Sequence, residues 1–163
     1  MRIRDILDPR HIVLDIHKGT KREILTALSH PLAQTRRSLD HQLLIDALVQ
    51  REETSSTAIA DGIAIPHGKL DLGDEVLCAF GRSAEGVDFE SFDGNPTHIF
   101  FLLVSPEHEP SLHLRWLAHL AVMLKNPMLR RALVAATTPE AVLTALDEEE
   151  KALARREAAV RKP

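Results

Sequence analysis

The chain has 163 residues, of which 44% are hydrophobic and 27% charged, and this matches one globular domain rather than a disordered chain. Its net charge of -4 and its scarcity of aromatic residues offer neither a basic field nor a stacking surface, so nucleic acid is not an expected partner. No apolar run approaches the roughly 20 residues that a membrane span needs. Cys78 is the only cysteine, which excludes an intrachain disulfide and suits a reducing compartment. We therefore expect a single-domain, cytoplasmic protein without direct membrane insertion.

The N-terminal half combines short apolar runs with helical patterns. Residues 11–16 (HIVLDI) predict a short strand. Thr20 is a candidate N-cap for a helix that should reach about residue 28 and end before Pro31. Apolar residues at helical spacing over residues 39–51 predict a second helix, with Asp40 as its N-cap and Arg51 at its end. A polar loop then leads into a strand at residues 63–65.

Two apolar runs in the second half, residues 76–80 and 98–104, do not alternate with polar residues and have the length of strands buried on both faces. A helix is predicted from residue 111 to about residue 125, and two more begin at the pairs Asn126-Pro127 and Thr138-Pro139. Interleaved strands and helices predict an α/β layer fold for residues 1–147. Residues 148–163 form a charged tail that we expect to be a helical or frayed extension.

His67 lies in the stretch GIAIPHGK, where Pro66 fixes its own backbone and Gly68 has no side chain to shield the ring. This arrangement predicts a histidine exposed on a rigid stem just past a strand. A neutral imidazole is nucleophilic and leaves readily afterwards, so such a residue suits the transfer of a phosphoryl group. From this stretch alone, an ordinary turn histidine remains the simpler interpretation.

The position of His113 favours a functional interpretation of His67 over an ordinary turn histidine. A helical projection centres it on the apolar face that carries Leu117, Leu120 and Leu124. It also lies in the first turn of its helix, where free backbone N–H groups and the helix dipole favour an anion. A core histidine with one hydrogen bond would explain this position equally well. It would not explain why His67 and an arginine are available too.

Four motifs follow one another along the chain: Arg51-Glu52, Ser56-Thr57, GIAIPHGK and SLHLRWL. Together they resemble the IIA components of the bacterial phosphoenolpyruvate-dependent phosphotransferase system, of the mannitol and fructose type with its nitrogen-regulatory branch. The resemblance covers roughly residues 3–147 and implies a mixed β-sheet sandwiched by helices. It also implies a phosphohistidine relay with no cofactor and no metal. The donor would be a histidine phosphocarrier protein, and the acceptor or docking partner a IIB domain or a regulatory target.

By this resemblance, His67 is the phosphorylated residue, His113 the second active-site histidine that hydrogen-bonds the phosphoryl group, and Arg51 the cation that neutralises it. The assignment agrees with the physics, because the outer oxygens of a phosphoryl group in transfer are negative and a guanidinium fork stabilises them. Further candidate phosphate-binding residues are Ser56, Thr57 and Gly68. In the loop before the strand, Ala58 and Ala60 replace glycines common in the family, so left-handed backbone is not expected at these positions.

The nitrogen-regulatory branch, a signalling role, is the preferred interpretation, because the chain carries no fused IIB or IIC region and reads PHGKL at the site. A sugar-specific IIA component of the fructose or mannitol type is the main alternative, since its IIB domain can be a separate chain. A docking module without phosphoryl transfer is another, although Arg51 and His113 are both present. A metallohydrolase on His67, His98 and His113 would lack the i, i+4 histidine pair and glutamate base of a zinc protease.

Overall fold

The computed structural model describes residues 1–161, within which five α-helices and five strands follow two short 3-10 turns, Ile3–Asp5 and Pro9–His11. The strands are β1 (Ile12–Val13), β2 (Ile63–Ala64), β3 (His67–Leu70), β4 (Leu77–Val87) and β5 (Thr97–Pro106). The helices are α1 (Lys21–Thr35), α2 (His41–Thr54), α3 (Pro110–Met123), α4 (Pro127–Ala135) and α5 (Pro139–Val160).

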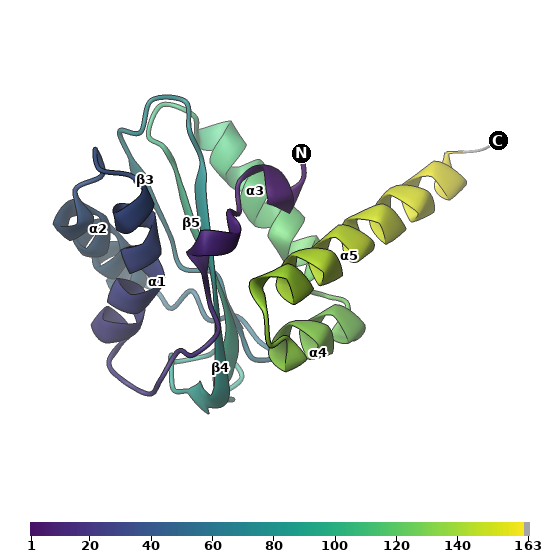
Figure 1. Ribbon diagram of the computed structural model, residues 1–163, viewed down its shortest axis with the longest axis horizontal. Helices are drawn as coiled ribbons and strands as arrows, with labels where there is room; N and C mark the ends of the chain where they lie inside the picture. The colour runs from purple at the N-terminus through teal and green to yellow at the C-terminus, as the bar shows by residue number, and fades with distance from the viewer. Residues whose placement is uncertain (162–163) are drawn as a thin grey trace.

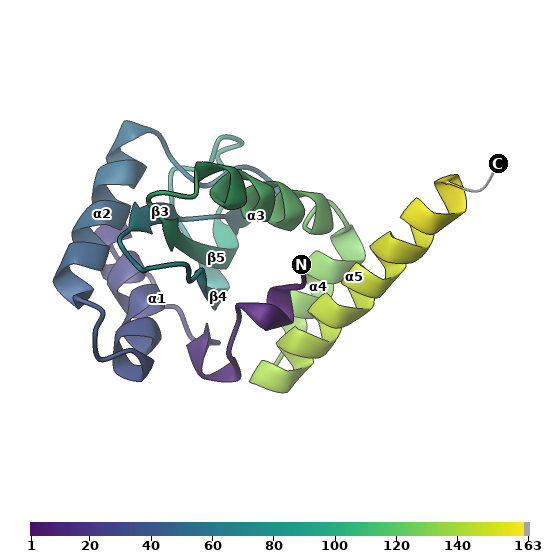
Figure 2. The same ribbon diagram turned by 90° about the horizontal axis from the view of Figure 1, so that it is seen from above.

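The strands form one mixed sheet. β4 lies between β1 and β5, and both β2 and β3 pair with the other edge of β5. β4 runs antiparallel to β5, whereas the other three pairings are parallel. Helices α1 and α2 cover one face of the sheet, and α3, α4 and α5 cover the other (Figure 1, Figure 2). This confirms the expected α/β fold, a mixed sheet sandwiched by helices.

The central strand β5 is buried on both faces, as its unbroken apolar run predicts. Its side chains alternate between two hydrophobic clusters, one beneath each helical layer: Ile99, Phe101 and Leu103 in one, and Phe100, Leu102 and Val104 in the other. None of the six is more than 1% exposed. The strand therefore has no solvent-facing side that would require polar residues in alternate positions.

The first helix is longer than the sequence predicts. An end before Pro31 was the expectation from the proline, but α1 continues to Thr35 with the proline inside it. Pro31 lacks a backbone N–H, which removes one hydrogen bond from the helix. The next turn nevertheless buries Leu32, only 1% exposed, in the hydrophobic cluster that holds Leu28. Tertiary packing thus offsets much of the cost of the proline.

Strand boundaries differ from the prediction at three places. The strand expected over residues 11–16 is confined to β1, because the Leu14 carbonyl accepts hydrogen bonds from the Arg82 guanidinium at 3.0 and 2.7 Å instead of pairing in the sheet. β4 continues past residue 80 to Val87 as the antiparallel partner of β5. The expected turn at His67 is also wrong, because parallel pairing with β5 makes His67 the first residue of strand β3.

Four helices begin as predicted, since the predicted N-cap side chains accept a hydrogen bond from a backbone N–H of the first turn: Thr20, Asp40, Asn126 and Thr138. Helix α3 begins at Pro110, one residue before the predicted start, and has no side-chain cap. Helix α5 passes without a break from the main body into the charged segment and projects away from the sheet (Figure 1). Glu150 ties this helix down by accepting from Ile3 N at 2.8 Å and bonding His119 Nε2 at 2.7 Å.

The domain boundary at residue 147 stays a prediction, and residues 162–163 of the expected tail lie outside the described residues. In the part of the chain that the structure describes, none of the helices has both the length and the apolar composition required to cross a bilayer.

Candidate active site

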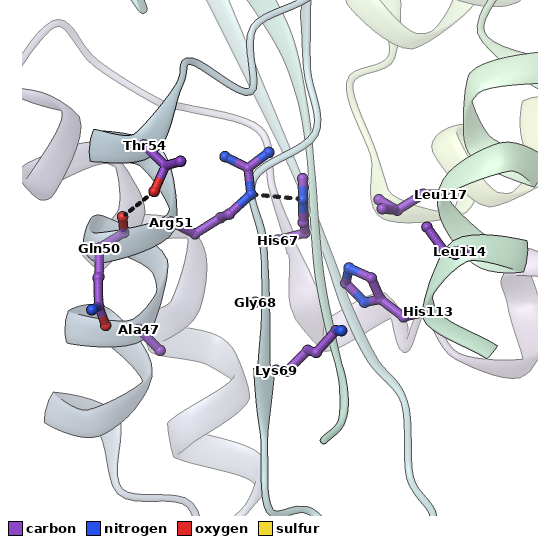
Figure 3. Close-up of a pocket in the computed structure, with 10 residues that line it drawn as sticks. All are labelled: Ala47, Gln50, Arg51, Thr54, His67, Gly68, Lys69, His113, Leu114 and Leu117. Atoms are coloured by element: carbon purple, nitrogen blue, oxygen red, sulfur yellow. Dashed lines mark hydrogen bonds between the residues drawn. The ribbon is translucent and has the colours of Figure 1, made fainter. Parts of the chain in front are cut away.

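Arg51, His67 and His113 line one cavity of ≈ 550 Å³ although they come from three different elements (Figure 3). Arg51 lies in the last turn of α2, His67 begins β3, and His113 lies in the first turn of α3. The parallel pairing of β3 with β5 sets His67 opposite Leu103. Because α3 begins shortly after β5 ends, its first turn passes close to the same end of the sheet. The structure therefore brings together the three residues that the sequence analysis singled out.

The two ring nitrogens of His67 differ in protonation: Nδ1 carries the proton, and Nε2 has the lone pair that can act as a nucleophile. Its Nδ1 lies 2.7 Å from the Ile65 carbonyl oxygen, which only accepts, so Nδ1 carries the ring proton. Nε2 therefore holds a lone pair, and the Arg51 Nε–H donates to it at 3.2 Å. The ring is partly buried rather than exposed on a turn, because it opens a strand beside β5.

Burial chiefly lowers the pKa of His67 below its ordinary value; the Ile65 carbonyl opposes this shift and the Arg51 charge adds to it. A lowered pKa means that the ring is neutral at pH 7, since an unperturbed histidine titrates near pH 6.5. The neutral form is the nucleophilic one. His67 is thus in the correct protonation state, with the correct nitrogen unprotonated, to attack an electrophile in the cavity.

His113 faces His67 from the other side of the cavity, with the ring centroids 5.3 Å apart and the planes tilted by 54°. Figure 3 shows the His113 ring projecting from α3 towards His67. The side chain is only 5% exposed, which confirms that it lies on the buried face of its helix. Its Nδ1 is 2.9 Å from Ser105 Oγ. Burial, supported by the charges of His67, Lys69 and Arg51, lowers the pKa of His113 to about 4, so this ring is also neutral at pH 7.

Lys69 is a second cation of the cavity that the sequence analysis missed. It lines the cavity, and Figure 3 shows its side chain directed towards His113. Strand periodicity contains the signal, because residues two apart on a strand point to the same face and Lys69 follows His67 by two positions. The sequence analysis did not apply this periodicity because it placed His67 just past a strand and not within one.

The structure does not bring Ser56 and Thr57 to the cavity. Ser56 Oγ donates to the Phe89 carbonyl at 2.9 Å. Thr57 Oγ1 donates to Glu52 Oε2 at 2.5 Å, and Thr57 N donates to Glu52 Oε1 at 2.9 Å. The phosphate-binding role expected of these two hydroxyls therefore finds no support in this arrangement. Gly68, in contrast, lines the cavity.

Glu52 fixes the loop that follows Arg51. It is 5% exposed, and besides the two bonds from Thr57 its carboxylate accepts from Lys21 Nζ at 2.9 Å. The left-handed residues of this loop are Asp61 and Gly62, with φ of 56° and 75°, and not the two alanines that replace glycines of the family. The expectation that the alanines avoid a left-handed conformation is confirmed.

His98 does not join His67 and His113. Its Nδ1 donates to the Ser83 carbonyl oxygen at 2.9 Å, and the ring lines a different cavity. Within residues 1–161, no group of three or more His, Cys, Asp or Glu side chains is arranged to hold a metal ion. The three-histidine centre of the metallohydrolase interpretation is therefore not assembled.

Comparison with known proteins identifies the family. Residues 5–149 match the family model described as "Phosphoenolpyruvate-dependent sugar phosphotransferase system, EIIA 2". The chain belongs to this family. The matched segment of this EIIA chain contains every residue of the cavity, which agrees with the motifs recognised in its sequence.

Relatives of this EIIA chain carry both sugar-specific and regulatory names. The fructose-specific EIIABC component of Bacillus subtilis is 33% identical over 93% of this chain, which spans 24% of that protein. A nitrogen regulatory protein of Bradyrhizobium diazoefficiens is 32% identical over 90% of this chain and 95% of its own length. The solved structure of nitrogen regulatory protein IIA-Ntr from Neisseria meningitidis gives a TM-score of 0.81 at 33% identity, covering 88% of this chain and 98% of that one.

Proposed function

We propose that this EIIA chain is a phosphohistidine carrier and that His67 Nε2 accepts the phosphoryl group from a histidine phosphocarrier protein. A P–N bond forms at His67 Nε2 while the P–N bond to the donor histidine breaks, and His67 keeps its Nδ1 proton bonded to the Ile65 carbonyl. The single observation that carries the proposal is this bond of 2.7 Å, which leaves Nε2 as the lone-pair nitrogen beside Arg51. No oxidant, metal or cofactor is needed, because nucleophile and leaving group are both imidazoles.

The groups around His67 supply electrostatic stabilisation. Arg51 releases its bond to Nε2 when the phosphorus approaches, and its guanidinium then donates to the phosphoryl oxygens, which carry the developing charge. Lys69 adds a second cation on the same face. The buried ring of His113 contributes a polar group opposite the nucleophile without adding a charge, since it is neutral at pH 7.

We propose a nitrogen-regulatory role, which the high TM-score and near-complete mutual coverage with a IIA-Ntr structure support. A sugar-specific role is the second candidate, favoured by the 33% identity to a fructose-specific component. In the first case the phosphorylated and unphosphorylated forms dock on a regulatory target, and in the second the group passes to a IIB domain. We propose the cytoplasm as the compartment, because the one cysteine is a free buried thiol suited to a reducing environment.

The test is to incubate the purified chain with labelled phosphoenolpyruvate, enzyme I and the histidine phosphocarrier protein, and to measure acid-labile protein phosphate. We expect one phosphate per chain, no label on His67→Ala, and full label on the control His108→Ala, whose ring is exposed and bonds Asp74 away from the cavity. NMR of the ring nitrogens should show phosphate on Nε2. Label that survives in His67→Ala would refute the assignment, and transfer onward to a fructose-type IIB domain would favour the sugar-specific role.

A further inference from the structure

Ser105 is a buried hydroxyl beside the candidate active site that no sequence motif indicated. It lies near the end of β5, is 0% exposed, and pairs in the sheet with Lys69 of β3. Its Oγ is 2.9 Å from the Nδ1 of His113. Within the described residues, this ring nitrogen is the one hydrogen-bond partner that the structure gives to the hydroxyl.

The number of protons on the Ser105 hydroxyl and the His113 ring fixes which of the two groups donates the hydrogen bond. A hydroxyl has one proton to donate, and a neutral imidazole has one N–H and one bare nitrogen. If His113 Nδ1 carried the proton, it would donate to Ser105 Oγ and leave the hydroxyl proton buried without an acceptor, which costs about 1–3 kcal/mol. If the hydroxyl donates instead, both groups are satisfied. Nδ1 is then the bare nitrogen, and the ring proton lies on Nε2.

We propose that Ser105 is a positioning residue that holds His113 as the Nε2–H tautomer, so that its N–H faces the cavity as a donor to the phosphoryl group on His67. The functional half of this inference rests on the proposed phosphoryl transfer, whereas the tautomer itself does not. Neutrality at pH 7 supports it, since burial lowers the pKa of His113 to about 4. A doubly protonated ring could not accept from the hydroxyl.

The two histidines of the cavity then have opposite tautomers set by opposite partners. The Ile65 carbonyl accepts from His67 Nδ1, which leaves Nε2 bare and nucleophilic. The Ser105 hydroxyl donates to His113 Nδ1, which leaves Nε2–H as a donor. With 5.3 Å between the ring centroids, one Nε2 attacks phosphorus and the other can bond an outer oxygen of the same group. The Ser105 hydroxyl therefore determines whether His113 Nε2 donates a hydrogen bond to the phosphoryl group or presents a lone pair that repels its oxygens.

NMR of the ring nitrogens at pH 7 tests the tautomer directly on the unphosphorylated protein. In the wild type we expect a bare Nδ1 and a protonated Nε2 on His113, and the reverse on His67. Ser105→Ala should leave His113 as a mixture of both tautomers, and Ser105→Thr, which keeps the hydroxyl, should restore the wild-type pattern. A protonated Nδ1 on wild-type His113, or an unchanged pattern in Ser105→Ala, would overturn the proposal.

Transfer kinetics test the functional half. Ser105→Ala should slow phosphorylation of His67 about twofold, because an even mixture of tautomers leaves about half of the His113 rings with the Nε2–H donor. Ser83→Ala is the matched control, because Ser83 is another buried serine, on strand β4 and bonded to Gly86 N at 3.2 Å outside the cavity. Wild-type rates in Ser105→Ala despite an altered tautomer would refute the donor role. Absence of label on the wild type would refute the proposed relay instead, while the NMR result would still decide the tautomer.

Discussion

Replacement of Arg51 by glutamine tests the electrostatics of the candidate site most directly. The change removes a guanidinium whose Nε donates to His67 Nε2 at 3.2 Å and whose Nη1 donates to the Ser55 carbonyl at 3.1 Å. Both acceptors are neutral in the resting protein. The loss should therefore lower the free energy of unfolding by only about 1 kcal/mol. Once a phosphoryl group arrives at Nε2, the same guanidinium faces negatively charged oxygens.

The expected loss in rate follows from that difference in charge. A hydrogen bond to a charged group contributes about 1.5–3 kcal/mol, so Arg51→Gln should slow phosphorylation of His67 about 10- to 150-fold. Rapid-quench measurement of labelled phosphate passing from the phosphorylated phosphocarrier protein gives this rate. Arg51→Lys keeps the charge but loses the planar fork, and it should give an intermediate rate.

The control is Arg10→Gln, because Arg10 is an exposed arginine paired with Asp8 and does not line the cavity. It should transfer at the wild-type rate. Urea unfolding of each variant separates loss of rate from loss of fold. If a folded Arg51→Gln protein is phosphorylated at the wild-type rate, the guanidinium does not stabilise the phosphoryl group during transfer.

Two further predictions concern stability. His113 is protonated only near pH 4 in the folded chain but near pH 6.5 when unfolded, so the unfolded state binds more protons between these values. The free energy of unfolding should therefore fall as pH drops through this window, and less so in His113→Gln, as urea titrations would measure; equal pH dependence would contradict the buried neutral ring. Gly81→Ala should destabilise by about 1–3 kcal/mol, because its Cβ would lie 2.3 Å from Leu28 Cδ2. Gly68→Ala should unfold like the wild type, since its Cβ would meet only Leu48 Cδ2 at an ordinary 3.6 Å; equal losses in both variants would contradict the packing argument.

The convergence of His67 and His113 could be predicted because each belongs to a local pattern. Helical periodicity puts His113 on the apolar face of α3 whatever the rest of the fold does. The apolar run before His67 predicts the short strand β2 just ahead of it, although His67 itself begins β3. Periodicity does not indicate that these two residues and Arg51 belong to one site, whereas the order of the motifs along the chain does. The cavity contains all three residues.

The remaining parts of the site depend on register between distant segments, which no local pattern specifies. Parallel pairing of β3 with β5 sets Lys69 opposite Ser105, and this pairing makes both residues neighbours of His113. Glu52 follows Arg51 in sequence but turns away to bind Thr57 and Lys21. Ser56 and Thr57, close to Arg51 in sequence, therefore bond elsewhere, and the buried hydroxyl that contacts His113 comes from strand β5.

The arrangement also explains how one phosphoryl group can change what a partner meets. With both histidines neutral, the cavity carries the positive charges of Arg51 and Lys69. A phosphoryl group transferred to His67, which keeps its Nδ1 proton, lowers the net positive charge of the cavity by about one unit and places negatively charged oxygens beside Arg51. Leu114, on the rim and 65% exposed, offers an apolar contact in either state. A docking protein would thus keep its contact with Leu114 in both states and respond to the difference in charge beside it. This difference in charge can discriminate the two states for a regulatory target as well as for an onward acceptor.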